Sequence, residues 1–390
     1  MTGDPDVAGR DGYDLDGPGP APAWGHIGHS PRPLPATPPL DGVTDAEVCV
    51  VGLGGSGLTA ALHLAERGAD VVAVDAYGIG AGAAARNGGF LLAGLALFHH
   101  DAVAAYGRDR AVALYRWTIE ELDRTLDGLP ADVARRVGAL RIAADDAEAR
   151  DCERMLADMQ ADDLPGEAYD GPEGVGVLIP TDAAMDPHAR CAVLAERALA
   201  AGARLHAPFR VAAIEPGAVG AADGAVVRAE RVIVAVDGGL ELLLPELRDR
   251  VHSVRLQMVA TAPDHDVHLP RPVYRRWGYD YAQQLPTGEV LLGGFRDRGV
   301  DDEGAPPWPS AVVQDHLDAE LRRFGVTAPV THRWAARAGF TPDKLPICEQ
   351  VRPGVYVIGG YSGHGNVVGT ACGRLAADAA LDGTPLRLPA

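Results

Sequence analysis

The sequence predicts an α/β fold, α+β overall, in which a Rossmann-like dinucleotide-binding domain is joined to a second domain with a mixed sheet. Three observations lead to this prediction. The apolar run at 47–51 continues into a glycine cluster and then into an apolar stripe at helical spacing, which is how a βαβ unit begins. Short strand patterns at 272–295 include a tight turn, which is typical of antiparallel pairing. After 355 the chain returns to strand, glycine-rich turn and helix.

The other elements follow from hydrophobic periodicity and from the residues that start and stop helices. A second strand is expected at 70–75, after the helix stop at Arg67 and Gly68. Helices are predicted at 111–126, 147–162, 187–201 and from the last glycine turn to 381, and strands at 204–214, 225–236, 272–275, 279–285, 289–295 and 355–358.

Length and composition limit the possible functions. A chain of 390 residues has room for two lobes, because one domain takes roughly 100 to 200 residues. The formal net charge is -19, from 35 basic and 54 acidic residues. Such an acidic chain is poorly suited to bind a phosphate backbone, so we expect no nucleic-acid partner. Lys344 is the only lysine, so anion recognition must otherwise depend on arginines and backbone N–H groups.

The cysteines and histidines predict neither disulfides nor a metal site. The 5 cysteines are widely spaced, with no C-x-x-C pair, and are expected to be reduced core thiols. His265 and His268 share a proline-bounded acidic loop, for which a solvated loop is the better interpretation than a metal site. With no leader pattern and no apolar run long enough for a membrane span, we expect a cytoplasmic protein.

The first 44 residues differ in composition from the rest. They contain nine prolines and eight glycines, a composition that buries little apolar surface. We expect a tail that is at least partly disordered. Two interpretations remain for 24–40: a flexible leader, or an extended segment with Trp24 that lies along the folded body.

Gly52-Leu53-Gly54-Gly55-Ser56-Gly57 fits G-x-G-x-x-G in the context that this motif requires, after a strand and at the start of a helix. Gly52 permits a tight turn, Gly54 lets the backbone approach a pyrophosphate, and Gly57 allows close packing of helix on strand. The helix N-terminus adds unpaired N–H groups. Asp75 ends the next strand, where an acid can bind an adenosine ribose, which favours NAD or FAD over NADP.

Two further glycine-rich segments favour the flavin. The segment 78–89 is too rich in small residues to pack a core and too long for a hairpin, so it is expected to approach a planar group. The segment 360–366 links a strand to an apolar-faced helix and so offers a second helix N-terminus. A reduced flavin develops negative charge that such a terminus stabilises, whereas a nicotinamide makes no such demand.

With these segments the chain resembles the D-amino-acid oxidase and glycine oxidase family of FAD-dependent oxidoreductases, especially its gamma-glutamylputrescine oxidase-like branch. The similarity spans Trp24 to the C-terminus, and five segments carry it: the glycine loop, Arg86-Asn87-Gly88-Gly89, 234–238, Thr341-Pro342-Asp343-Lys344-Leu345-Pro346 and 360–365. It implies a discontinuous FAD-binding domain (45–98, 176–238 and 331–390) and a substrate, or cap, domain (99–175 and 239–330).

The resemblance also implies where noncovalent FAD is held. The residues implied are Gly52, Gly54, Gly55, Ser56, Gly57, Asp75, Ala76, Arg86, Asn87, Gly88, Gly89, Val211, Ala235, Val236, Gly360, Ser362, Gly363, His364, Gly365 and Asn366. The family usually has Ser-Gly where this chain has Ala84-Ala85, so a common hydroxyl contact is missing. Covalent attachment through a cysteine before Thr341 is excluded, because 334–337 contains none.

The chemistry expected is oxidation of a primary or secondary amine or amino acid, with hydride passing from the C–H beside nitrogen to flavin N5 and the imine then hydrolysing. Arg337 is the candidate for binding a substrate carboxylate, with an ordinary ion pair as the alternative. Tyr279 and Tyr281 share one face of a strand and are pocket candidates, although half-buried sheet tyrosines are common. Tyr361 and Arg296 are weaker candidates. His364, in the glycine-rich segment 360–366, is a further candidate for the reaction site.

The electron acceptor stays open from the sequence. Sarcosine-oxidase-like enzymes use a lysine to activate oxygen; here Lys344 lies beyond Thr341-Pro342-Asp343, so His364, an arginine or water is expected to take that role. Oxygen reduced to hydrogen peroxide is the first expectation. The alternatives are a 2-hydroxy-acid or amine dehydrogenase with another acceptor and, outside enzymes, a degenerate dinucleotide-binding protein.

Overall fold

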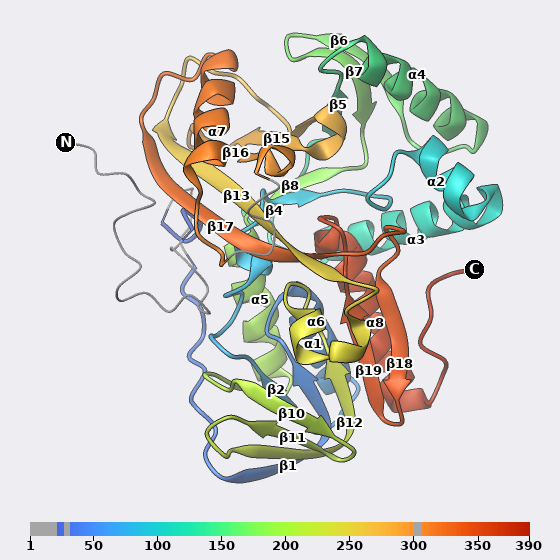
Figure 1. Ribbon diagram of the computed structural model, residues 1–390, viewed down its shortest axis with the longest axis vertical. Helices are drawn as coiled ribbons and strands as arrows, with labels where there is room; N and C mark the ends of the chain where they lie inside the picture. The colour runs from blue at the N-terminus through green and yellow to red at the C-terminus, as the bar shows by residue number, and fades with distance from the viewer. Residues whose placement is uncertain (1–21, 27–31, 300–305) are drawn as a thin grey trace.

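The computed structural model describes residues 22–26, 32–299 and 306–390. Two eight-stranded sheets dominate it, one at the lower end of the view in Figure 1 and one at the upper end. A third sheet of three short strands, β3 (Phe90–Leu91), β8 (Ala183–Met185) and β4 (Ala134–Arg136), lies in the region between them. The predicted α/β class, with a Rossmann-like part and a mixed second sheet, is confirmed.

The lower sheet is mainly parallel. Its strand order is β10-β11-β12-β1-β2-β9, and β19 pairs with β12 and with β18. Its strands are β1 (Val43–Val51), β2 (Val71–Val74), β9 (Arg204–His206), β10 (Val211–Glu215), β11 (Ala218–Ala221), β12 (Val226–Val234), β18 (Ile347–Arg352) and β19 (Val355–Gly359). β2 and the second half of β1, residues 48–51, are continuous buried apolar runs, as is typical of parallel strands covered on both faces.

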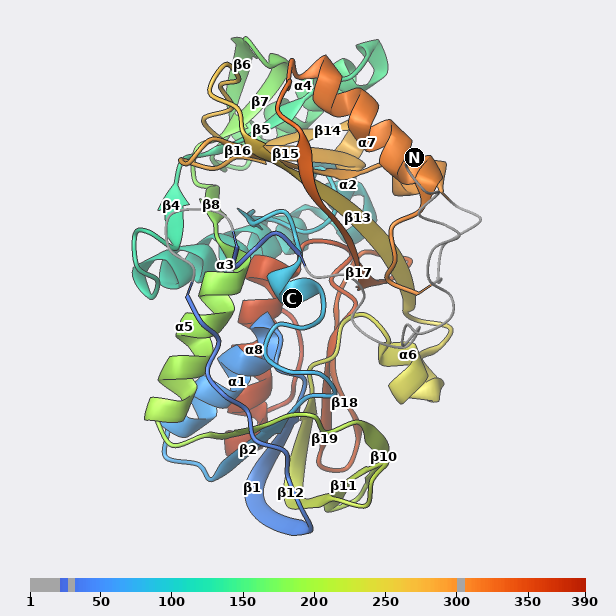
Figure 2. The same ribbon diagram turned by 90° about the vertical axis from the view of Figure 1, so that its left-hand side faces the viewer.

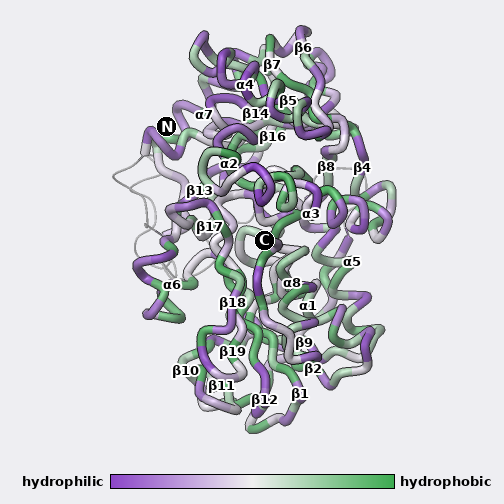
Figure 3. The backbone as a smooth tube through the Cα atoms, turned by 90° about the vertical axis from the view of Figure 1, so that its right-hand side faces the viewer, coloured by the Kyte–Doolittle hydropathy of each residue, from purple (hydrophilic) through white to green (hydrophobic). Residues whose placement is uncertain are grey.

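Three helices lie side by side against one face of this sheet: α1 (Gly55–Glu66), α5 (Pro187–Ala200) and α8 (Gly365–Asp382). Figure 2 shows α1 between α5 and α8. Figure 3 shows long hydrophobic stretches in α1 and α8, as expected of helices buried along much of their length. This packing brings the N-termini of α1 and α8 to the same edge of the sheet, above the ends of β1 and β19.

The upper sheet is almost entirely antiparallel, with the order β17-β13-β16-β15-β14-β5-β7-β6. Its strands are β5 (Ala139–Ile142), β6 (Glu167–Gly171), β7 (Gly174–Ile179), β13 (His252–Pro263), β14 (Val273–Arg275), β15 (Asp280–Gln284), β16 (Glu289–Gly294) and β17 (Val330–Phe340). The outer helices are α2 (His99–Tyr106), α3 (Arg108–Asp127), α4 (Asp146–Ala161) and α7 (Ala311–Arg323), and the short α6 (Leu240–Leu243) follows β12.

Most of the predicted helices and strands are confirmed to within a few residues, including the antiparallel run at 272–295. The single strand expected at 204–214 is wrong: the segment forms two strands, β9 paired with β2 and β10 paired with β11, and Pro208 lies between them. The division into domains stays a prediction. One detail of it differs from the sheet pairing: β17 was assigned with the FAD-binding part, yet it pairs along its length with β13 in the upper sheet. The sequence of β17 has the pattern of any buried strand, and that pattern does not show which sheet the strand joins.

The described residues also bear on three smaller predictions. The 5 cysteines are all buried and free, as expected. No group of His, Cys, Asp or Glu in the described part of the chain has metal-binding geometry. No helix within those ranges is both long enough and apolar enough to cross a membrane. Most of the tail prediction, 1–21 and 27–31, lies outside the described residues.

Candidate functional site

Two cavities adjoin where the glycine loop meets β13 and β17. The glycine-loop cavity, about 240 Å³, runs from Gly52 and Asp75 to Arg337 and Gly365. The aromatic cavity, about 280 Å³, is lined by Phe90, Tyr274, Trp277, Tyr279, Tyr281 and Phe340. The two share the lining residues Ala83, Arg86, Asn87, Leu256, Ala336, Ala338, Gly363 and Asn366. A bound molecule can therefore extend from one into the other.

The glycine loop has the geometry of a pyrophosphate cradle. Gly52 has a φ of +111°, which lets the chain turn sharply out of β1. A Cβ on Gly57 would lie 1.9 Å from the carbonyl oxygen of Gly52, so the helix packs directly on the turn. Gly54 caps α1 without any side-chain hydrogen bond, which leaves the first N–H groups of the helix available to a ligand.

Asp75 organises this loop from the end of β2. Its carboxylate accepts hydrogen bonds from the backbone N–H groups of Leu53 at 2.9 Å, Tyr77 at 2.8 Å and Gly78 at 3.0 Å. Burial raises the pKa of the carboxyl, and the three N–H groups oppose that rise. Asp75 lines the glycine-loop cavity, and its contact with an adenosine ribose stays a prediction.

Arg190 is a site residue that sequence reasoning missed. It lies in the first turn of α5, is 1% exposed, and lines the glycine-loop cavity beside Gly55, where a Cβ would lie 3.0 Å from Nη1 of the arginine. Its guanidinium donates to the Thr370 hydroxyl, and within the described ranges no carboxylate forms an ion pair with it. Burial lowers its pKa. The available signal was a charged residue inside the apolar run Ala189-Arg190-Cys191-Ala192.

A second uncapped helix N-terminus faces the junction of the two cavities. His364 caps α8 with no side-chain hydrogen bond, as the glycine-rich turn predicted. Asn366, in the first turn, exchanges amide hydrogen bonds with Asn87 at 3.0 and 3.2 Å and donates to the Phe90 carbonyl at 2.8 Å. The Arg86–Gly89 loop is thus fastened to the helix whose dipole points toward the cavity.

Asp237 lies in the segment 234–238 that carries the resemblance, but it was not among the predicted site residues. Its carboxylate accepts from the backbone N–H groups of Gly339 at 3.0 Å, Gly360 at 2.9 Å and Tyr361 at 3.1 Å. Burial raises its pKa to about 6. Asp237 therefore joins the end of β12 to the end of β17 and to the turn before α8, where the two cavities meet.

Three successive carbonyl groups of the Arg86–Gly89 loop, called the flavin loop below, accept side-chain hydrogen bonds from distant segments. Trp334 donates to the carbonyl of Arg86 at 2.8 Å, Trp24 donates to that of Asn87 at 2.8 Å, and Gln283 donates to that of Gly88. Trp24 is 2% exposed and packs with Trp334 in one core cluster. Of the two interpretations of the segment around Trp24, the structure supports the one in which it lies on the folded body.

Replacing Trp24 by phenylalanine is expected to weaken FAD binding about fivefold. The ring would still pack, but the Asn87 carbonyl would lose its donor, a loss worth about 1 kcal/mol. Fluorescence titration of the apoprotein with FAD measures the dissociation constant. Trp117→Phe is the matched control, because Trp117 lies on α3 and lines neither cavity. An unchanged dissociation constant for Trp24→Phe would contradict the prediction.

The aromatic cavity has a wall of stacked rings. Tyr274 stacks on Tyr281 with ring centroids 5.9 Å apart, and Phe90 contacts both. Burial raises the pKa of Tyr274 to about 12 and that of Tyr281 still higher, so both phenols stay neutral. Behind Tyr274, the guanidinium of Arg141 lies 4.8 Å from the ring centroid and 3.7 Å from Asp182, whose pKa burial raises to about 7.

His364 faces this cavity in its neutral form. Burial, reinforced by the positive charge of Arg141, lowers its pKa to about 3. Its Nδ1 has no hydrogen-bond partner among the described residues. The ring lies 6.2 Å from that of Tyr274, centroid to centroid. His364 can therefore exchange hydrogen bonds with a ligand but does not supply a positive charge near neutral pH.

Arg296 and Lys344 bring positive charge to this cavity, as does Arg86 at its junction with the glycine-loop cavity. The guanidinium of Arg296 lies 4.6 Å from the ring centroid of Tyr279 and 4.7 Å from that of Phe340. The ammonium of Lys344 lies 5.4 Å from the Phe340 centroid, and burial together with Arg296 lowers its pKa. From its position after Thr341-Pro342-Asp343, Lys344 was not expected to take the oxygen-activating role of the lysine in sarcosine-oxidase-like enzymes. The residue has a left-handed φ of 61°, and it lines the cavity.

The predicted site residues divide into three groups. Tyr279, Tyr281 and His364 line the aromatic cavity, as does Arg296, and Tyr361 lines the glycine-loop cavity. Of the predicted cofactor residues, most line one or both cavities, whereas Gly57, Ala76, Gly89, Val211 and Gly360 line neither. Arg337 lines the glycine-loop cavity and not the aromatic one, whereas its neighbours Ala336 and Ala338 line both. A substrate contact of Arg337 stays a prediction.

The residues present fit FAD. A diphosphate needs backbone N–H groups and a cation, and the glycine-loop cavity offers the α1 N-terminus and the buried charge of Arg190. A flavin needs a flat space beside a helix N-terminus, and the junction of the cavities offers this at 363–366. No cysteine of the described ranges lines either cavity, in keeping with a noncovalent cofactor.

Comparison with known proteins identifies the same cofactor chemistry. Residues 47–379 match the family described as FAD dependent oxidoreductase. The chain is 28% identical to a probable oxidoreductase, OrdL, of Rhizobium meliloti, over 89% of this chain and 86% of that protein. It is also 28% identical to gamma-glutamylputrescine oxidoreductase of Escherichia coli, over 85% of this chain and 83% of the relative.

Solved structures agree on the fold. Glycine oxidase of Geobacillus kaustophilus superposes with a TM-score of 0.69 at 21% identity, over 86% of this chain and 94% of that one. L-proline dehydrogenase of P. horikoshii superposes with a TM-score of 0.71 at 20% identity, over 88% and 95%. Together with the matched family, the two cavities lead to one conclusion: this chain belongs to the FAD dependent oxidoreductase family and is an enzyme with FAD as its cofactor.

Proposed function

We propose that the enzyme oxidises a primary or secondary amine or an amino acid that binds in the aromatic cavity. The observation that carries the proposal is the position of this cavity: it opens from the flavin loop at Arg86 and Asn87 and is lined by six aromatic rings. Such a lining suits the uncharged amine that hydride transfer requires, since a neutral nitrogen and its carbon chain gain from apolar surroundings. The name of the Escherichia coli relative supports an amine substrate.

The residues of the chain orient the substrate. Arg296 and Lys344 offer two cations in the cavity, and a carboxylate on the substrate would bind there rather than at Arg337. The neutral His364 and the phenols of Tyr274 and Tyr281 offer hydrogen bonds toward the substrate nitrogen. The buried rings exclude water from the reacting C–H bond. Bound FAD would supply the hydride acceptor, its N5 atom.

Oxygen is the acceptor that we propose, with hydrogen peroxide as its product. The support is electrostatic, because the ammonium of Lys344 lies in the same cavity, where a cation favours the reduction of oxygen. The imine formed from the amine needs only water for its hydrolysis, which follows its release from the enzyme.

The test is anaerobic reduction of the purified, FAD-loaded enzyme. We expect the flavin absorbance to bleach with at least one member of a panel of amines and amino acids, and to return when air is admitted. Bleaching by 2-hydroxy acids alone would overturn the choice of substrate class. Bleaching by amines without recovery in air, but with recovery on adding a quinone, would overturn oxygen as the acceptor and leave the amine oxidation standing.

A further inference from the structure

We propose that Trp277 selects the substrate's side chain at the mouth of the aromatic cavity, and that Glu148 is the positioning residue that holds Trp277 there. The inference rests on the proposed function in one respect, since it takes the aromatic cavity as the substrate site. Trp277 lines that cavity and is 43% exposed, so its ring borders both the interior and the solvent.

The backbone at Trp277 is held in an unfavourable conformation. Arg276 and Trp277 have left-handed φ values of 51° and 54°, and Gly278 follows with a φ of 84°. Two consecutive L-residues in this region are strained, because Cβ crowds the backbone, and they persist only where the surroundings fix them. The position of the indole therefore depends on the groups that hold this backbone.

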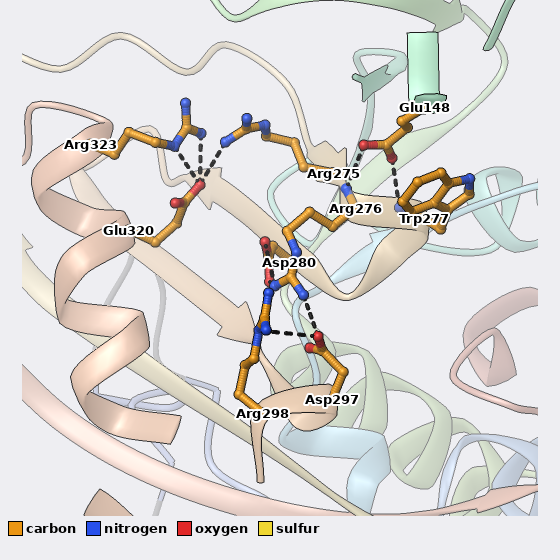
Figure 4. Close-up of polar contacts among 9 residues, drawn as sticks. All are labelled: Glu148, Arg275, Arg276, Trp277, Asp280, Asp297, Arg298, Glu320 and Arg323. Carbon is orange, nitrogen blue, oxygen red and sulfur yellow. Dashed lines mark hydrogen bonds and ion pairs between the residues drawn. The ribbon is translucent and has the colours of Figure 1, made fainter. Parts of the chain in front are cut away.

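Glu148 is the group that holds it. This glutamate is 2% exposed and lies in the first turn of α4. Its carboxylate accepts from the backbone N–H groups of Trp277 at 2.6 Å, Arg276 at 3.0 Å and Ala144 at 2.8 Å. Figure 4 shows the side chain reaching from its helix to the two strained residues. Successive N–H groups that converge on one carboxylate form an anion-binding concavity, which fixes the left-handed turn.

The indole itself is oriented by Asp151. The Asp151 carboxylate lies one turn after Glu148 on α4 and accepts from the Trp277 Nε1–H at 2.8 Å. The polar atom of the ring is thus directed to α4. What the ring offers to the cavity is its carbon surface.

Arg276 fixes the same turn from the other side. Its guanidinium donates to Asp280 at 3.0 and 3.2 Å and to Asp297, and it lies 5.0 Å from the ring centroid of Phe295. The contacts with the two aspartates are drawn below Glu148 in Figure 4. With carboxylates binding both the backbone and the guanidinium, the turn has little freedom to move Trp277 away from the cavity.

The chemistry of the cavity then names the substrate class. Arg296 and Lys344 suit a carboxylate, and the Trp277 indole suits an apolar chain. We therefore infer that the preferred substrate is an amine bearing a carboxylate and an apolar substituent of several carbons, rather than an amino acid as small as glycine.

The experiment uses the FAD-loaded enzyme and two carboxylates that cannot be oxidised as amines, acetate and hexanoate. Binding is followed by the shift of the flavin absorption spectrum. We expect hexanoate to bind about tenfold more tightly than acetate, since part of its longer chain is buried against the indole. Trp277→Ala should reduce this preference to about twofold and leave the acetate dissociation constant unchanged. Trp277→Phe should keep most of the preference.

Glu148→Gln tests the positioning role. The amide keeps the size of the side chain and one acceptor oxygen, but its NH2 group replaces the other oxygen and leaves at least one of the backbone N–H groups of the turn without an acceptor. The turn should therefore loosen, and the preference for hexanoate should fall to about threefold. Acetate binding should not change, whereas a general loss of structure would weaken both ligands. Glu153→Gln, an exposed position on the same helix, is the matched control and should leave both constants as in the wild type.

Equal binding of acetate and hexanoate by the wild-type enzyme would overturn the inference, as would a Trp277→Ala variant that keeps the hexanoate preference. The proposed function fails separately. If no amine bleaches the flavin while hexanoate binding depends on Trp277, the amine substrate is wrong and the role of Trp277 stands.

Discussion

Gly57→Ala is expected to yield a protein that purifies without FAD. The added Cβ would lie 1.9 Å from the Gly52 carbonyl oxygen, a backbone atom that cannot rotate away. Helix α1 would have to move off the turn on the order of 1 Å, which separates its N–H groups from the position of the diphosphate. We expect FAD affinity to fall by about 3 kcal/mol or more, at least about 100-fold.

The ratio of flavin to protein absorbance after purification measures this loss, and titration of the variant with FAD gives the affinity. Gly220→Ala is the control: it makes the same change on β11 of the same sheet, but a Cβ there meets nothing within 4 Å. A Gly57→Ala enzyme that retains one FAD per chain would show that the helix does not have to approach the turn so closely.

Features that depend on neighbours in the sequence were predictable. The glycine loop, Asp75 and the turn before α8 each lie between a strand and a helix, and periodicity alone places those. Side chains on one strand were only partly predictable. Tyr279 and Tyr281 both line the aromatic cavity, but Tyr279 has a helical backbone conformation just before β15, so the period of two does not place it there. On β17, Arg337 lines the glycine-loop cavity and not the aromatic one, whereas Ala336 and Ala338 line both.

Features that depend on tertiary contact were not predictable. Arg190 looked like one more charge on an amphipathic helix, and only the packing of α5 on α1 puts it beside Gly55. Lys344 lines the aromatic cavity and has a left-handed backbone angle, which no local pattern predicts because the residue is not glycine. Glu148 meets Trp277 only because α4 packs over the strand ends of the upper sheet. The positions of Arg190 and Glu148 thus depend on contacts between segments far apart in the chain.

Arg190→Leu is expected to weaken FAD binding and, at the same time, to stabilise the protein without FAD. The buried guanidinium of the apoprotein has the Thr370 hydroxyl as a partner and no ion-paired carboxylate among the described residues, so its charge is poorly compensated. Replacing a poorly compensated buried charge by an apolar side chain of similar size is often stabilising, by about 1 to 4 kcal/mol. With the diphosphate in place, the same charge gains an anionic partner, and losing it should cost about 2 to 4 kcal/mol of binding, roughly 30- to 1000-fold.

The opposite signs of these two effects separate a ligand-binding role from a structural one. Thermal unfolding measures the stability of the apoprotein, and titration with FAD measures the affinity for the cofactor. Arg190→Lys keeps the charge and should retain more affinity than leucine, whereas Arg197→Leu, on the exposed side of the same helix where the arginine pairs with Glu66 at 3.1 Å, should change neither quantity. A variant that loses apoprotein stability and keeps its FAD affinity would assign Arg190 to the packing of α5 on α8. A gain in one quantity with a loss in the other is the result that only a cofactor-binding cation explains, because no packing defect stabilises the empty protein.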